Sequence, residues 1–196
     1  MYGIQVNGQV VAQFAAPLHV KNVVPVYLTD TMSLSRRVSR RAVQRWEIQS
    51  NVVPLSSDAN AFFVDLVIKG KYSEVDVVMP QNYGVISKRT NTATPVATGS
   101  AGASQVTISG VNGLIPKGTF VRFSNHSKIY MTTSDISSSG PLEIFPELRS
   151  AVSGTNMHCK DDVIMTAYYD GETVSGMLYS DGVLMDPGSV LLVEKV

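Results

Sequence analysis

The fold class is decided by residues 105–145, which read QVTISGVNGLIPKGTFVRFSNHSKIYMTTSDISSSGPLEIF. Four short apolar stretches follow one another here: Gln105 to Ile108, Thr119 to Phe123, Lys128 to Thr133, and Leu142 to Phe145. Turn-forming clusters separate them at 110–113, 124–127 and 137–140. Short strands at such close spacing are typical of a small barrel. We therefore predict a compact β-module, OB-like or SH3-like, inserted at residues 96–154.

Strand patterns continue on both sides of this insert. The opening alternation Ile4, Val6, Val10 runs across Asn7-Gly8, a dipeptide that favours the positive φ angles of a hairpin turn. Other β-branched stretches lie at 20–28, 75–79, 163–169, 173–179 and 189–196. The segment 87–104 is rich in Thr, Ala, Ser and Gly and predicts a linker or long loop. We predict that residues 1–95 and 155–196 form one discontinuous body, a β-sandwich or barrel.

One short helix is expected in this body. Its apolar positions follow the i, i+3, i+4, i+7, i+8 spacing of a single helical face: Ala59, Phe62, Phe63, Leu66 and Val67. Ser56 or Ser57 can cap the helix, and Gly70 can end it. We expect Phe62, Phe63, Leu66 and Val67 to form the face that packs against the core.

Composition supports the β assignment and excludes several classes. The 196 residues include 28 Val and 22 Ser, and charged residues make up only 16%, against about 25% in an ordinary globular domain. A single cysteine, Cys159, rules out a scaffold held by intrachain disulfides. No apolar run reaches membrane-spanning length, and the first residues lack a signal-peptide pattern. We expect a soluble protein made in a reducing compartment, without membrane partners.

The net charge of zero conceals a division along the chain. Residues 1–134 carry 13 basic and six acidic side chains, whereas residues 135–196 carry three and ten, giving +7 and −7. The basic part is densest in one run: Arg36, Arg37, Arg40, Arg41 and Arg45. Such a run can bind phosphates, but the chain as a whole is neutral and only Trp46 offers a stacking ring. We therefore favour a subunit contact with carboxylates of a neighbouring copy, or the lining of a lumen.

Motifs that carry chemistry are absent from the sequence. It contains no G-x-S-x-G nucleophile elbow, no phosphate-binding loop, no dinucleotide fingerprint and no H-E-x-x-H. Residues 158–162 (HCKDD) include metal-ligand types, but neighbours in an extended segment point to opposite faces. His19 and His126 have no triad partners nearby, although a triad can assemble from distant segments. We expect no enzyme activity, no catalytic residues, no cofactor and no metal.

Two segments carry a resemblance to a known family. They are 113–135 (GLIPKGTFVRFSNHSKIYMTTSD) and 141–149 (PLEIFPELR), with weaker likeness at 45–55 and 185–196. This pattern resembles tail proteins of tailed bacteriophages, in particular the distal tail proteins next to the baseplate hub. The resemblance implies a tail-tube-like β-body and an outward-facing small barrel, assembled as a sixfold ring at the far end of the tail tube. It implies no catalytic residues.

Function and partners follow from that resemblance as expectations. We expect a structural virion protein, located in the tail and assembled in the host cytoplasm, that joins the tail tube to the baseplate hub. Its partners would be copies of itself in a hexameric ring, the tail tube protein, the baseplate hub protein, and fibre or peripheral baseplate proteins. Nucleic acid would meet it only as DNA passing through the lumen.

The alternative is a receptor-binding or carbohydrate-binding β-module at the tail tip. Exposed aromatic side chains on the insert would favour it, and the candidates are Phe120, Phe123, Tyr130 and Phe145. The alternation of the strands makes core packing of most of these rings the stronger expectation.

Overall fold

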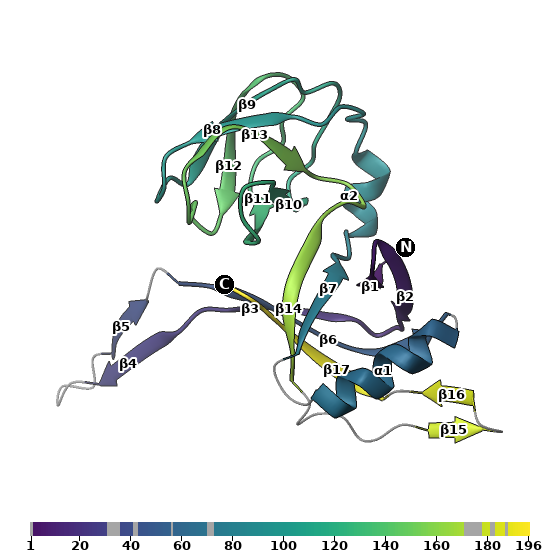
Figure 1. Ribbon diagram of the computed structural model, residues 1–196. Helices are drawn as coiled ribbons and strands as arrows, with labels where there is room; N and C mark the ends of the chain where they lie inside the picture. The colour runs from purple at the N-terminus through teal and green to yellow at the C-terminus, as the bar shows by residue number, and fades with distance from the viewer. Residues whose placement is uncertain are drawn as a thin grey trace.

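The computed structural model describes residues 2–30, 36–40, 43–55, 57–69, 73–170, 178–180, 183–186 and 188–196. Within these ranges the chain is mainly β, with two helices (Figure 1). The prediction of a mainly β protein is confirmed. Neither helix of the described part has the length and apolar character needed to cross a membrane.

The body is built on a seven-stranded antiparallel sheet in the order β17-β14-β7-β1-β2-β6-β3. Its strands are β1 (Gly3–Val6), β2 (Gln9–Phe14), β3 (His19–Val23), β6 (Arg45–Pro54), β7 (Glu74–Val78), β14 (Ile164–Asp170) and β17 (Ser189–Glu194). β17 also pairs with β6, in register Val190 with Ser50. The paired strands β17, β14, β7, β1, β2 and β6 therefore form a closed set. β3 pairs with the edge of β6 that lies opposite β17.

Local sequence explains the elements of this body. Asn7 and Gly8 both adopt positive φ, 49° and 83°, in the turn between β1 and β2, as the Asn-Gly pair predicts. Alternate residues of β14 and β17 are buried, including Met165 and Leu192, because successive side chains of a strand point to opposite faces. The alternating pattern thus places one face of each strand in the core.

Helix α1 (Ser57–Lys69) covers part of the sheet and contacts β2 and β6. Phe63 and Leu66 are buried in the body core, and Phe62 packs partly buried against it. The side chain of Val67, the fourth residue expected on this face, lies outside the described residues.

The second unit is a closed barrel in the order β10-β11-β12-β9-β8-β13. Its strands are β8 (Val96–Gly99), β9 (Gln105–Ser109), β10 (Phe120–Phe123), β11 (Ile129–Thr132), β12 (Gly140–Phe145) and β13 (Val152–His158). It has its own apolar core, which includes Phe123 and Tyr130. A small barrel was predicted at 96–154, and its last strand continues to His158. The division of the chain into two domains stays a prediction.

The prediction of a linker or long loop over residues 87–104 holds for residues 89–95 and 100–104, and it is wrong for two elements. Helix α2 (Tyr83–Lys88), which the sequence analysis did not predict, has Asn82 as its N-cap and ends inside the segment, and β8 lies within it. One small residue of the segment, Gly99, is needed for close packing, because a Cβ there would lie 2.9 Å from Cγ1 of Val106, whereas nothing lies within 4 Å of a Cβ at Gly102. Composition alone does not distinguish a tightly packed strand from a flexible loop.

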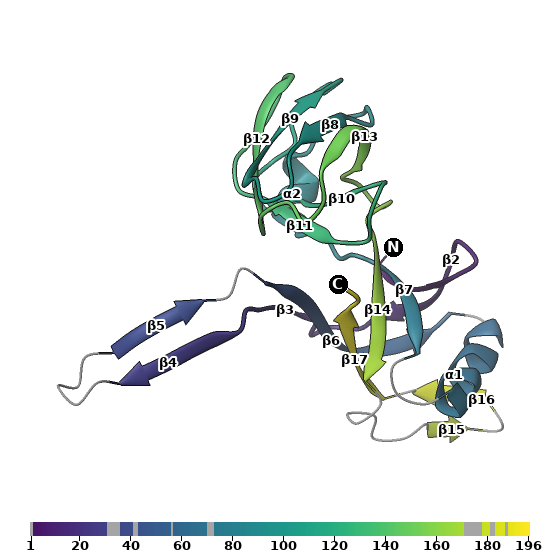
Figure 2. The ribbon, with the colours of Figure 1, turned by 60° about the vertical axis from the view of Figure 1, so that its left-hand side comes forward.

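Two ribbons complete the fold. β4 (Val26–Asp30) pairs with β5 (Arg36–Arg40), and this pair extends away from the body (Figures 1 and 2). β15 (Leu178–Ser180) pairs with β16 (Val183–Asp186). The apolar stretch expected at 20–28 is therefore divided between β3 and β4, and Pro25, which has no N–H to donate to a ladder, lies at the break.

Buried polar contacts hold the barrel to the body. The Lys128 ammonium lies 2.6 Å from Glu194 Oε2, and Trp46 Nε1 donates to the Ile129 carbonyl at 3.0 Å. Gln81, in the connection after β7, donates through Nε2 to the Phe120 carbonyl and accepts from its N–H, as a neighbouring strand would. The barrel is thereby tied to the body at several separate points.

Candidate functional site

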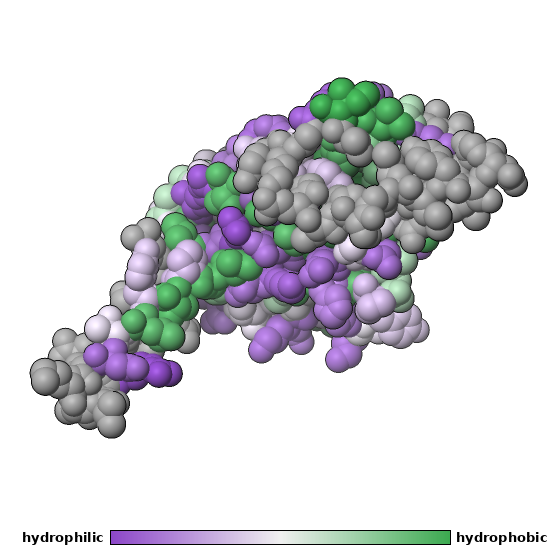
Figure 3. Space-filling model, turned by 90° about the horizontal axis from the view of Figure 1, so that it is seen from below, coloured by the Kyte–Doolittle hydropathy of each residue, from purple (hydrophilic) through white to green (hydrophobic). Residues whose placement is uncertain are grey.

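An exposed apolar surface lies on the ribbon formed by residues 26–30 and 36–40, which we call the arm. Every residue of β4 is exposed, and Leu28 keeps 59% of its surface accessible. Val26, Tyr27 and Leu28 are consecutive, so apolar side chains lie on both faces of the ribbon. Figure 3 shows hydrophobic residues along the arm, at the left of the view. A two-stranded ribbon is marginally stable on its own in water, so a partner surface would stabilise it.

The structure distributes the arginine run over two elements. Arg36, Arg37 and Arg40 lie in β5, and Arg36 pairs with Asp30 across the arm at 2.9 Å. Arg45 begins β6 and pairs with Glu47 at 2.7 Å. Arg41 lies outside the described residues. Three of the five arginines therefore belong to the arm, and their predicted role at a subunit contact or lumen stays a prediction.

The root of the arm is also apolar. A cavity of about 410 Å³ there is lined by Val23, Pro25, Val43, Gln44, Arg45 and Val196. Val43 is exposed, whereas Gln44 is buried, and its Nε2 has no hydrogen-bond partner in the described part of the chain. The apolar surface of the arm thus continues to its junction with β6.

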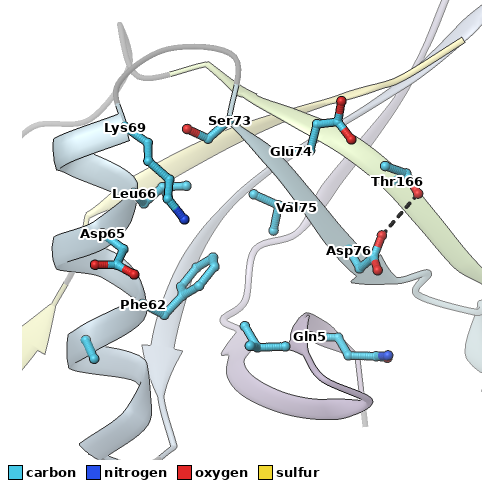
Figure 4. A pocket seen from close by; sticks show the side chains of 12 residues that line it. Gln5, Phe62, Asp65, Leu66, Lys69, Ser73, Glu74, Val75, Asp76 and Thr166 are labelled. Carbon is cyan, nitrogen blue, oxygen red and sulfur yellow. Dashed lines mark hydrogen bonds between the residues drawn. The ribbon is translucent and has the colours of Figure 1, made fainter.

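A second hollow of about 490 Å³, the α1 groove, lies between α1 and β7. Phe62 and Leu66 extend from the helix toward Val75, and polar side chains line both sides (Figure 4). Asp76 accepts a hydrogen bond from the Thr166 hydroxyl at 3.0 Å, and Glu74 pairs with Lys195. The groove combines an apolar floor with charged walls.

The outer face of α1 is apolar beside this groove. Ala61, Val64 and Ile68 are exposed, and Ile68 keeps 76% of its surface accessible. Val64 and Ile68 are one turn apart and therefore lie side by side on the helix. We call these three residues the α1 ridge. The sequence analysis did not predict the α1 ridge, because it considered only the helix face that packs against the core. The signal in the sequence was Ile68 one turn after Val64, both outside that face.

Folding also brings together a serine, a histidine and an aspartate from separate segments. Ser124 Oγ lies 3.0 Å from Nε2 of His158, and Nδ1 of His158 lies 2.7 Å from Oδ2 of Asp162. This is the connectivity of a hydrolytic triad. Asp162 also accepts from the Lys160 N–H, and although burial opposes the effect, the hydrogen bond from His158 and this backbone bond lower the pKa of Asp162.

The surroundings of this trio differ from those of a catalytic site. Ser124 lies in an exposed turn, lines neither cavity described above, and also lies within hydrogen-bonding distance of the Asn156 carbonyl, at 3.2 Å. The carboxylate of Asp162 is about half exposed, whereas the aspartate that orients a catalytic histidine is buried. We interpret the trio as a surface hydrogen-bond chain that fixes the segment leaving the barrel.

The fold separates Cys159 from the other residues considered as metal ligands, of which His158 and Asp162 contact each other. Cys159 is buried in the barrel core, and His158 faces the surface, as expected for neighbours in an extended segment. Burial raises the pKa of the Cys159 thiol. Among the described residues, no three His, Cys, Asp or Glu side chains gather closely enough to hold a metal ion.

The aromatic residues considered for glycan binding are mostly in the cores. Phe120, Phe123 and Tyr130 are buried, and only Phe145 of the four is exposed. Phe120 lies edge-on to Trp46 with ring centroids 5.1 Å apart, and Phe123 packs against Tyr130. The expectation that most of these rings pack inside is confirmed, and these four residues do not form an exposed stacking platform.

Comparison of the chain with protein-family models and with curated protein sequences found no match. The resemblance to phage distal tail proteins therefore rests on the sequence alone, in particular on segments 113–135 and 141–149.

Proposed function

We propose that this protein is a structural subunit of a bacteriophage tail, assembled as a ring, typically of six copies, at the distal end of the tail tube. The observation that carries the proposal is the arm: a two-stranded ribbon with a fully exposed apolar strand, held away from the body. Such a ribbon gains stability when a neighbouring subunit covers it.

The arrangement of the molecule supports assembly into a ring. The arm and helix α1 lie at opposite ends of the body in two views (Figures 1 and 2). A contact between different surfaces at opposite ends is heterologous, and a heterologous contact generates a closed ring when its rotation closes. The chain is neutral and lightly charged, so copies repel one another little.

The barrel suits a role in attaching other tail components. It is a separately closed unit that buried contacts at Lys128, Trp46 and Gln81 fix to the body. A ring would therefore present one rigidly held barrel per copy. The proposed neighbours are the tail tube protein, the baseplate hub protein, and fibre or peripheral baseplate proteins, with DNA passing through the lumen.

Light scattering and negative-stain microscopy of the purified full chain test this proposal. We expect rings with a central bore. A variant in which a short Gly-Ser linker replaces residues 26–40 should remain monomeric and still unfold cooperatively, because neither apolar core contains a described residue of this segment. A wild-type chain that stays monomeric at every concentration would contradict the proposal. A monomer that binds glycans on an array would support the carbohydrate-binding alternative instead.

A further inference from the structure

Two exposed apolar surfaces among the described residues, the arm and the α1 ridge, have complementary chemistry. On α1, Phe63 and Leu66 turn inward to the core, whereas Val64 and Ile68 face outward. The outward face of a surface helix is ordinarily polar. An isoleucine that is 76% exposed beside a second aliphatic side chain therefore marks a face suited to contact with another apolar surface.

The charges beside the two surfaces have opposite signs. The α1 groove, next to the ridge, is lined by three carboxylates, Asp65, Glu74 and Asp76, and by one ammonium, Lys69. Lys195 offsets part of this charge by pairing with Glu74.

The arm carries the opposite balance. Its acidic residue Asp30 is paired with Arg36, and Arg37 and Arg40 add two further positive charges. The arm is therefore basic where the α1 groove is acidic, in addition to the apolar side chains that both surfaces expose.

The positions of the arm and the α1 ridge in the body decide whether they meet within one copy or between two copies. Because the arm and α1 lie at opposite ends of one copy (Figures 1 and 2), the arm does not cover its own ridge. A second copy can supply the missing surface to each end. Every copy in a closed ring then has both its arm and its ridge engaged, which is the condition for a heterologous assembly without free ends.

We propose that the arm of one copy docks on the α1 ridge of the next. The apolar side chains of β4 cover Val64 and Ile68, and the arginine-rich strand β5 lies beside the acidic α1 groove. This inference rests on the proposed function, because it identifies the two surfaces through which the ring forms.

Cysteine cross-linking tests the contact directly. Leu28→Cys and Ile68→Cys are made as separate variants, mixed, and treated with a short bis-maleimide. We expect a cross-linked heterodimer from the mixture and little product from either variant alone. Cys159 is buried and serves as the common background. Tyr83→Cys, at an exposed residue outside both surfaces, is the matched control and should not link to Leu28→Cys.

Association measurements provide the second test. Leu28→Asp and Ile68→Asp should each weaken self-association about tenfold or more, because each removes apolar contact area. Tyr83→Asp should leave association unchanged. Since Leu28 and Ile68 are exposed, the melting temperature of the monomer should stay the same in both variants.

The outcomes separate this inference from the proposed function. Rings that persist in Leu28→Asp and Ile68→Asp, together with no heterodimer cross-link, would overturn the arm-to-ridge contact and leave ring assembly standing. A wild-type chain that never associates would overturn both.

Discussion

The side-chain nitrogen of Lys128 lies 2.6 Å from Oε2 of Glu194, and their side chains are only 4% and 0% exposed. Lys128 also donates to the carbonyl and Oε1 of Gln44, while Glu194 accepts the N–H groups of Trp46 and Ile129. Burial lowers the pKa of Lys128, although Glu194 acts to raise it. One ion pair thus joins the barrel, the start of β6 and the end of β17.

Replacing one member of this pair should destabilise the protein strongly. Glu194→Ala leaves a buried ammonium and two N–H groups without their acceptor, so we expect a loss of about 3–5 kcal/mol in the free energy of unfolding. The matched control is Lys195→Met, which breaks the exposed pair with Glu74 and should cost much less, because solvent screens an exposed pair. Urea unfolding measures both. Equal losses in the free energy of unfolding would contradict the claim that the buried pair contributes more to stability than the exposed pair.

Gly113 should tolerate no side chain. Its φ is +102°, and a Cβ would lie 2.6 Å from the backbone carbon of Thr90. The backbone segments around Gly113 and Thr90 are also joined by hydrogen bonds, which the N–H groups of Thr90 and Asn91 donate to the Leu114 carbonyl. Gly110→Ala is the control, because its φ is +74° but nothing lies within 4 Å of the added carbon.

Thermal unfolding compares the two glycine variants. In Gly110→Ala the free energy of unfolding should fall by about 1–2 kcal/mol, the cost of holding alanine in the left-handed backbone conformation. Gly113→Ala should lose more, because the added methyl group also displaces backbone. The interpretation fails if Gly110→Ala is the less stable of the two.

Acidification should weaken the barrel through His126. Its Nε2 lies 2.8 Å from the Tyr130 hydroxyl, which accepts the Arg149 N–H, so Tyr130 donates to a neutral imidazole. Burial, with Arg149 and Arg122, lowers the pKa of His126. In the unfolded chain this histidine has an ordinary pKa of about 6.5. Between that pH and the lower folded-state pKa, the unfolded chain therefore binds more protons than the folded chain.

The sign of the pH effect follows from this difference. The contribution of His126 to stability is complete above about pH 6.5 and is lost progressively as the pH falls toward its lowered folded-state pKa. Urea midpoints at pH 7.5 and 5.5 should differ less in His126→Gln than in wild type. His19→Gln, at an exposed residue of β3, should keep the wild-type difference. An unchanged pH dependence in His126→Gln would contradict the assignment.

Trp46 and Phe120 should couple energetically across the junction of body and barrel. Their rings meet edge-on with centroids 5.1 Å apart, and Trp46 is the chain's single tryptophan. A double-mutant cycle with Trp46→Leu and Phe120→Leu should give a coupling energy of about 0.5–1.5 kcal/mol. The same cycle with Trp46→Leu and Phe145→Leu is the control, and coupling of equal size there would argue against a specific contact.

Short-range patterns in the sequence predicted a large part of the fold. The Asn7-Gly8 pair predicted the turn between β1 and β2, helical spacing predicted α1, and closely spaced strands predicted the barrel. Each of these signals depends on residues a few positions apart, because backbone preference and side-chain periodicity act locally. The +7 and −7 division along the chain does not by itself determine which charged side chains meet.

Tertiary structure decided the features that join distant residues. The pairing of β17 with β6 closes the body, Lys128 meets Glu194 across 66 positions, and Ser124 meets His158 across 34. The sequence by itself determined most of the strands, helix α1 and the turn at Asn7-Gly8, because those choices depend on neighbouring residues, but it did not determine α2 or β8. Only the folded chain decided which apolar residues, such as Leu28 and Ile68, remain outside, because exposure depends on which distant segments cover a side chain.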